Sequence, residues 1–73
     1  MVSFNSANQI RLKLKMQLYV YSWYDGSSVI NSNDGYDVII NVSRIDDQIR
    51  KIIPQVVDGV SIRTEVDNKK VYR

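Results

Sequence analysis

The sequence predicts an α+β fold: an antiparallel sheet of three to five strands with one helix packed across one of its faces. Three observations carry this prediction. Residues 10–23 alternate strictly between apolar and polar side chains, residues 36–42 and 60–66 alternate again with many β-branched residues, and the segment between those two has a helical repeat. The predicted order of elements is β-β-β-α-β-β.

The segment 10–23 is the longest predicted strand. Its even positions are apolar without a break: Ile10, Leu12, Leu14, Met16, Leu18 and Val20. A helix would scatter these positions around its circumference, whereas a strand places them all on one face. We therefore expect this apolar face to lie against the helix.

A flat strand of this length does not fit a domain of this size. At about 3.3 Å per residue, residues 10–23 would reach about 46 Å, while the radius of gyration of so short a chain is about 11 Å. Either a β-bulge bends the strand near residues 17–19, or one end projects and pairs with a neighbouring subunit.

The flanking segments complete the predicted domain. Residues 1–8 are mostly small and polar and are predicted to form a flexible N-terminal arm, so that residues 9–73 make up a single small domain. Asp25-Gly26 predicts a turn at residues 24–27, because such a pair supplies the positive φ of a tight turn.

Two further strands are predicted before the helix. Residues 28–31 read as a short strand, a second turn follows at Asn33-Asp34-Gly35, and residues 36–42 form a firm strand rich in β-branched residues. The alternative is a single long connection over residues 24–35.

The helix is predicted to begin after Ser43, an N-cap residue, with Asp46 three positions later as the capping-box acid. Pro54 removes a donor and disfavours helical angles at Ile53, so the helix either stops near Ile53 or kinks there and continues to Val57. The apolar stripe of this helix is Ile45, Ile49, Ile52, Ile53 and Val56.

The C-terminal part is predicted to return to the sheet. Asp58-Gly59 ends the helix, residues 60–66 form a strand, Asp67-Asn68 turns the chain, and residues 69–73 form a final short strand.

The composition argues against an enzyme. The chain has no histidine and no cysteine, which removes the usual nucleophile and base pairs, disulfides and soft metal ligands. Its carboxylates mostly belong to turns and to the helix start, and its three glycines are isolated, so no phosphate-binding loop is present. We expect no catalysis, no cofactor and no bound metal.

A binding role rests on the second face of the long strand. We expect its residues to point one way and form a partner-binding surface: Arg11, Lys13, Lys15, Gln17, Tyr19, Tyr21 and Trp23. Tyrosine, tryptophan and arginine dominate binding hot spots, which favours a protein partner. Single-stranded DNA or RNA is the alternative partner, because aromatic rings stack on bases while basic groups follow phosphates. In a competing interpretation, these aromatics only pack beside their cross-strand neighbours.

The size and the termini complete the expectations. A lone core of this size leaves little stability, and without disulfides or a metal we expect a homodimer that regulates or inhibits a protein partner.

No signal peptide and no membrane span are apparent, so a cytoplasmic protein without a membrane partner is expected. So short a chain without cofactor chemistry is typical of mobile-element genes.

Overall fold

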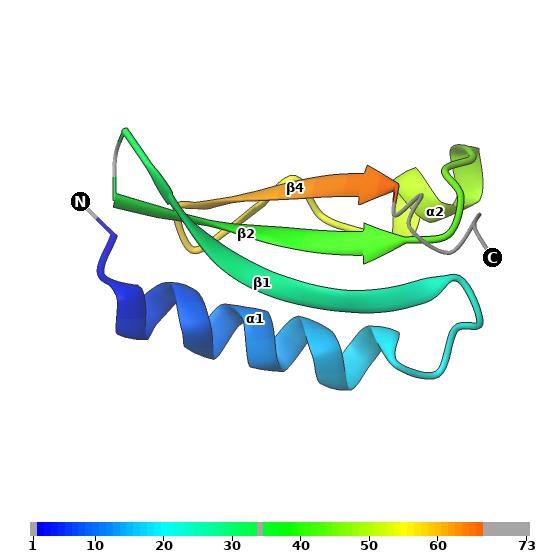
Figure 1. Cartoon of the computed structure of the whole chain (residues 1–73), viewed down its shortest axis with the longest axis horizontal. Helices are drawn as coiled ribbons and strands as arrows, with labels where there is room; N and C mark the ends of the chain where they lie inside the picture. The colour runs from blue at the N-terminus through cyan, green and yellow to red at the C-terminus, as the bar shows by residue number, and fades with distance from the viewer. Residues whose placement is uncertain (1, 34, 67–73) are drawn as a thin grey trace, which may run out of the picture.

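A computed structural model describes residues 2–33 and 35–66 of the chain and shows an α+β fold with a four-stranded mixed sheet (Figure 1). The elements in order are α1 (Phe4–Leu18), β1 (Tyr24–Ser32), β2 (Gly35–Val42), α2 (Asp47–Ile52), β3 (Val56–Val57) and β4 (Val60–Val66). The predicted α+β class is therefore confirmed, but the prediction of a single helix is wrong, because the described residues form two helices. The predicted order is also wrong: α1 replaces the first predicted strand, and β3, which was not predicted, precedes the predicted strand at residues 60–66.

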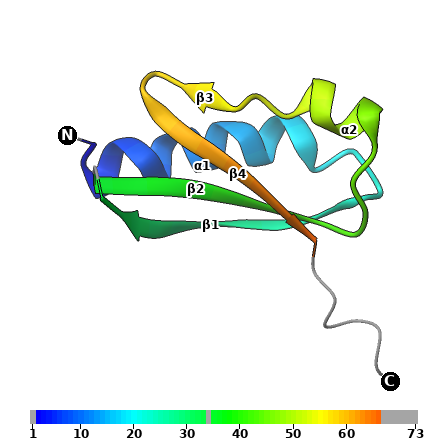
Figure 2. The same cartoon turned by 90° about the horizontal axis from the view of Figure 1, so that it is seen from above.

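The sheet is mixed rather than antiparallel, which corrects the prediction. Its strand order is β1-β2-β4-β3 (Figure 2). β1 and β2 are antiparallel, β2 and β4 are parallel, and β3 and β4 are antiparallel. The parallel pair arises because the chain passes through α2 and β3 after β2 and so returns to the same end of the sheet before β4 begins.

Residues 10–18 of the segment predicted as the long strand belong instead to α1, whose N-cap is Ser3, and residues 19–23 connect α1 to β1. The Ser3 hydroxyl accepts a hydrogen bond from the Ser6 backbone N–H at 3.1 Å. Residues 4–8 belong to this helix, so the prediction of a flexible arm there is wrong. Ile10 is the only β-branched residue in α1, and the helix is otherwise rich in leucine, lysine and glutamine, which are good helix formers.

The helix also removes the length problem. Its 15 residues span only about 22 Å, because a helix rises about 1.5 Å per residue. Neither the bulge predicted near residues 17–19 nor the exchange of a strand end between subunits therefore arises.

The alternation within residues 10–20 has a helical explanation. Residues two apart in a helix are separated by about 200° around the axis, so every second even position returns to the same side. Ile10, Leu14 and Leu18 are buried. The even positions between them, Leu12 and Met16, are exposed on the opposite side, and Val20, just past the end of α1, is exposed as well.

The core lies between α1 and the sheet. α1 runs along one face of β1 and β2 (Figure 1), and α2 adds Ile49 to the same core, followed by its C-cap residue Ile53. The buried residues of this core are Ala7, Ile10, Leu14, Leu18, Trp23, Val38, Ile40, Val42, Ile49, Ile53, Val60 and Ile62.

The predicted turn at Asp25-Gly26 is wrong, because β1 runs straight through it. The pairing register between β1 and β2 shifts between Tyr24 and Gly26, and Gly26 has φ 132°. The positive φ that suggested a turn therefore belongs to an irregularity inside a strand. The predicted reversal before residue 36 is confirmed, since β1 ends at Ser32 and β2 begins at Gly35.

α2 begins later than predicted. Asp46, not Ser43, is its N-cap, and the Asp46 Oδ1 atom accepts the Ile49 backbone N–H at 2.9 Å. The prediction that the helix ends near Ile53 is confirmed: Ile53 is the C-cap with extended angles, as expected for a residue before proline.

Asp58-Gly59 closes a β-hairpin instead of only ending a helix. Asp58 and Gly59 have φ 50° and 81°, the positive pair that a type I′ turn requires between β3 and β4. The predicted strand at residues 60–66 is confirmed as β4. The turn predicted at residues 67–68 and the strand predicted at 69–73 lie outside the described residues.

Candidate functional site

The seven residues predicted to share one strand face do not share a face, because most of them lie on a helix. Arg11 is turned toward the sheet: its Nε atom donates to Asn8 Oδ1 at 2.9 Å and its Nη1 atom to Ser27 Oγ on β1 at 3.5 Å. These bonds orient Arg11 within the fold rather than toward solvent.

Trp23 and Tyr21 follow α1 and take part in packing. Trp23 is only 6% exposed and belongs to the core. Tyr21 stacks on it, with ring centroids 4.8 Å apart and ring planes at 15°. Trp23 therefore presents almost no surface to a partner.

The remaining four predicted residues are exposed: Lys13, Lys15, Gln17 and Tyr19. Around a helix axis, Lys13 and Lys15 lie about 160° apart on two different sides. Of the apolar side chains between them, Leu12, Met16 and Val20 were expected in the core, and Tyr19 was expected on the partner-binding surface.

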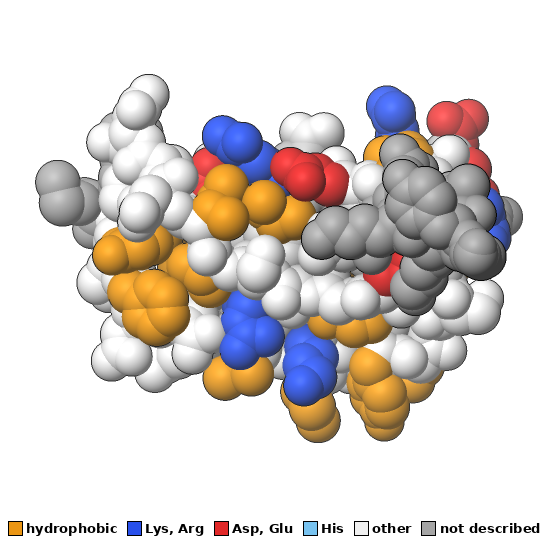
Figure 3. Space-filling model, in the orientation of Figure 1, with side chains coloured by type: hydrophobic (Ala, Val, Ile, Leu, Met, Phe, Trp, Pro, Cys, Tyr) orange, Lys and Arg blue, Asp and Glu red, His pale blue; other side chains and the backbone are white. Residues whose placement is uncertain are grey.

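These side chains form what we call the outer α1 surface, defined as Leu12, Met16, Tyr19 and Val20 with Lys13 and Lys15 at its borders. The four apolar residues are 43%, 70%, 61% and 69% exposed, respectively. In Figure 3, apolar and basic side chains alternate along the lower edge of the molecule, where α1 lies. The spacing i, i+4, i+8 of Leu12, Met16 and Val20 is the sequence signal that identifies this stripe.

The charge of the outer α1 surface has one sign. α1 contains Arg11, Lys13 and Lys15 and no aspartate or glutamate. The surface is therefore an apolar stripe with a lysine on each border.

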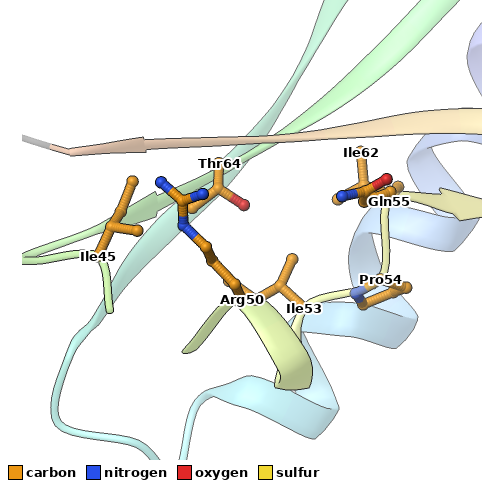
Figure 4. A pocket seen from close by; sticks show the side chains of 7 residues that line it. All are labelled: Ile45, Arg50, Ile53, Pro54, Gln55, Ile62 and Thr64. Atoms are coloured by element: carbon orange, nitrogen blue, oxygen red, sulfur yellow. The ribbon is translucent and has the colours of Figure 1, made fainter. Parts of the chain in front are cut away.

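The second candidate feature is a cavity between α2 and β4. The cavity has a volume of about 360 Å³ and is lined by Ile45, Arg50, Ile53, Pro54, Gln55, Ile62 and Thr64 (Figure 4). Three isoleucines supply its apolar part. The Arg50 side chain extends across it toward Thr64 in Figure 4. Within residues 2–33 and 35–66, Arg50 makes no ion pair and no side-chain hydrogen bond.

The two ion pairs among the described residues lie outside both candidate surfaces. Arg63 on β4 pairs with Asp37 on β2 at 3.2 Å, on the sheet face that points away from α1. Arg44 pairs with Asp46 at 3.4 Å. The hydrogen bond from the Ile49 N–H is the main cause that lowers the pKa of Asp46 below its ordinary value, and the nearby Arg44 lowers it further.

No group of three acidic side chains in residues 2–33 and 35–66 is placed to hold a metal ion. Neither described helix has the length and apolar character needed to cross a membrane. The outer α1 surface and the cavity between α2 and β4 are the two candidate sites considered below.

Comparison with known proteins adds no further constraint. No protein-family model matches the chain, and no curated protein and no solved structure matches it either.

Proposed function

We propose that this chain is a non-enzymatic interaction module that binds a protein partner through the outer α1 surface. The observation that carries the proposal is the exposed stripe Leu12, Met16, Tyr19 and Val20. Leu12 and Met16 lie on α1 opposite its core-facing stripe, and Tyr19 and Val20 continue the stripe past the end of the helix. A helix with apolar side chains on both sides is typically covered on both sides.

Burial of this stripe would provide useful binding energy. Full burial of a leucine, methionine or valine side chain contributes about 1.5–3 kcal/mol relative to exposure. Met16 and Val20 are the most exposed of the four and lie one turn apart, so they are the expected centre of the contact.

The charge of the surface favours a partner that carries acidic groups. Lys13 and Lys15 border the stripe, and the helix has no carboxylate to pair with them. Two copies packed face to face through α1 would bring lysines near lysines, which disfavours this surface as the dimer contact. An acidic protein partner would instead place its carboxylates against both borders.

Nucleic acid is less well supported. Trp23 is in the core and Tyr21 stacks on it, so the three aromatics do not form a row on which bases could stack. The two exposed lysines of α1 lie on opposite borders of an apolar stripe and do not follow a common track for phosphates.

The proposal is tested by placing a charge in the stripe. Met16→Glu should abolish capture of a partner from host lysate at about 150 mM salt. Val56→Glu is the matched control, because Val56 is also a large exposed apolar residue but lies on β3. It should leave capture unchanged. Circular dichroism should show both variants folded.

Two results would contradict the proposal. Equal capture by the wild type and by folded Met16→Glu would show that the stripe is not the contact. A concentration-dependent dimer in sedimentation that Met16→Glu converts to a monomer would show that the surface binds a second copy instead of a different protein.

A further inference from the structure

The second candidate surface is the edge of β4 that β3 leaves uncovered. β3 pairs with β4 only at Val56–Ser61 and Val57–Val60, and the Ile62 N–H adds one more bond to the Gln55 carbonyl at 2.8 Å. Beyond Ile62, no described residue pairs with this edge of β4, as Figure 2 shows for the part of the strand past the end of β3.

Pro54 is the reason that β3 is so short. The ring of Pro54 fixes its φ angle, and Pro54 has no N–H to donate to a neighbouring strand. The chain coming from α2 therefore joins the sheet only at Gln55. The place next to Thr64 that a longer β3 would occupy is therefore free of the described backbone.

The backbone of Thr64 points toward this free edge. Because the Ile62 N–H points to the β3 side, and because backbone direction alternates along a strand, the N–H and C=O of Thr64 and Val66 point to the same side. The Thr64 side chain points instead into the cavity between α2 and β4. Thr64 can therefore pair through its backbone with an added strand, while its side chain contacts a side chain of that strand in the cavity.

The cavity next to this edge combines an apolar floor with a cation. Ile45, Ile53 and Ile62 supply apolar contacts, and Arg50 extends over them with no acidic partner among the described residues (Figure 4). A ligand that fits must carry an apolar group and an anionic group close together.

We propose that this groove binds the C-terminal end of a peptide from a partner protein as an added strand antiparallel to β4. The peptide backbone pairs with Thr64, its last side chain, which is aliphatic, enters the cavity against Ile53 and Ile62, and its terminal carboxylate pairs with Arg50. Addition of a strand to an open sheet edge is a general mode of peptide recognition.

The direction of the strand explains why a chain end is required. A peptide antiparallel to β4 runs in the same direction as β3, so its C-terminus points toward Gln55. Gln55 and Pro54 block the next position along the edge. A peptide can therefore end beside Arg50 but cannot continue through the sheet.

A second copy of this chain does not fit the same edge in the register that pairs Thr64 with Thr64. Pairing two β4 strands around a two-fold axis at Thr64 would set Val66 of one copy opposite Ile62 of the other. The Ile62 position is already occupied by Gln55. The site is also separate from the outer α1 surface, so it stands or fails independently of the function proposed above.

The test compares two synthetic peptides with the sequence Ser-Thr-Glu-Ser-Val, one with a free C-terminal carboxylate and one with an amide. Titration followed by amide NMR should shift the Thr64 N–H for the free-acid peptide. The free acid should bind the full chain about tenfold tighter than the amide, as expected for loss of one charge-assisted hydrogen-bonded pair.

Two variants separate the role of Arg50 from general charge. Arg50→Gln should remove the tenfold preference for the free acid. Lys51→Gln, a change of the same charge on the adjacent exposed residue of α2, should preserve it, because Lys51 does not line the cavity. Equal binding of both peptides, an unshifted Thr64 amide, or an equal loss in both variants would overturn the proposal.

Discussion

Tyr21 lies flat against Trp23, with ring centroids 4.8 Å apart and an interplanar angle of 15°. Trp23 belongs to the same buried core as Leu18, the last residue of α1, and the Trp23 carbonyl accepts the Ser43 N–H at 2.9 Å. The pair therefore joins the end of the helix to the segment that follows β2. Tyr21, which is 37% exposed, shields the indole from water.

This packing predicts unequal effects for the two aromatic residues. Trp23→Ala should destabilise the fold by about 3–5 kcal/mol, since it leaves a large cavity in the core. Tyr21→Ala should cost roughly 1 kcal/mol, because it removes one partly exposed stacking contact. Chemical unfolding followed by far-UV circular dichroism measures both. Equal losses would show that Tyr21 is as important to the core as Trp23.

Gly35 and Gly26 allow a comparison of two glycine-to-alanine substitutions that differ in the space around the added methyl group. Both have positive φ, 124° and 132°, which strains any other residue. A Cβ at Gly35 would also collide with the Val2 carbonyl oxygen, whereas a Cβ at Gly26 would meet nothing. Gly35→Ala should therefore lower the melting temperature more than Gly26→Ala. The opposite order in thermal unfolding would show that Val2 moves away at little cost.

The Asp37–Arg63 ion pair should contribute little net stability. The Asp37 side chain is largely buried, but more than half of the Arg63 side chain is in solvent, which screens the attraction. A double-mutant cycle with Asp37→Asn and Arg63→Gln should give a coupling free energy of about 0.5–1 kcal/mol. A coupling above about 2 kcal/mol would mean that the pair behaves as a buried one.

The lowered pKa of Asp46 predicts that the free energy of unfolding falls in acid. The Ile49 N–H and Arg44 favour the charged carboxylate, so the pKa of Asp46 is lowered in the folded chain from the ordinary value of 3.8. The resulting stabilisation is present above pH 3.8 and is lost as the pH falls through the lowered pKa.

Asp46→Asn is the control for this effect, because an asparagine oxygen still accepts the Ile49 N–H but does not titrate. The wild type should be more stable than Asp46→Asn at about pH 7, and the difference should shrink toward about pH 2.5 in urea unfolding. A difference that does not change with pH would contradict the role assigned to the Asp46 charge.

The elements with a single strong local signal were predictable. β2 and β4 are rich in β-branched residues, and α2 ends where Pro54 requires it to end. The hairpin between β3 and β4 also has a clear signal in Asp58-Gly59, which the sequence interpretation used only as a helix stop. The glycine of Asp25-Gly26, by contrast, lies inside a strand, so the same dipeptide has two structural meanings.

The candidate surface was harder to predict, because a period-two pattern is also the sum of two helical stripes. Leu12 and Leu14 are equally apolar, and only one of them is buried. The preference of leucine, lysine and glutamine for helices was the available signal against a strand. Lys13 and Lys15 are exposed, as the prediction of an outward face required, but Trp23 was expected on the surface and is buried in the core.

The sequence by itself determined the α+β class, the strands β2 and β4 and the excess of positive charge near the N-terminus, and it limited the end of α2 to two alternatives, a stop near Ile53 or a kink there that continues to Val57. These depend on neighbouring residues, through propensity, caps and proline. Only the tertiary structure decided that residues 4–18 are a helix, that β2 and β4 are parallel, and that Ile10, Leu14 and Leu18 rather than Leu12, Met16 and Val20 face the core. Those outcomes depend on which surfaces of distant segments meet, because burial against the sheet chooses between two stripes that are equally apolar in the chain.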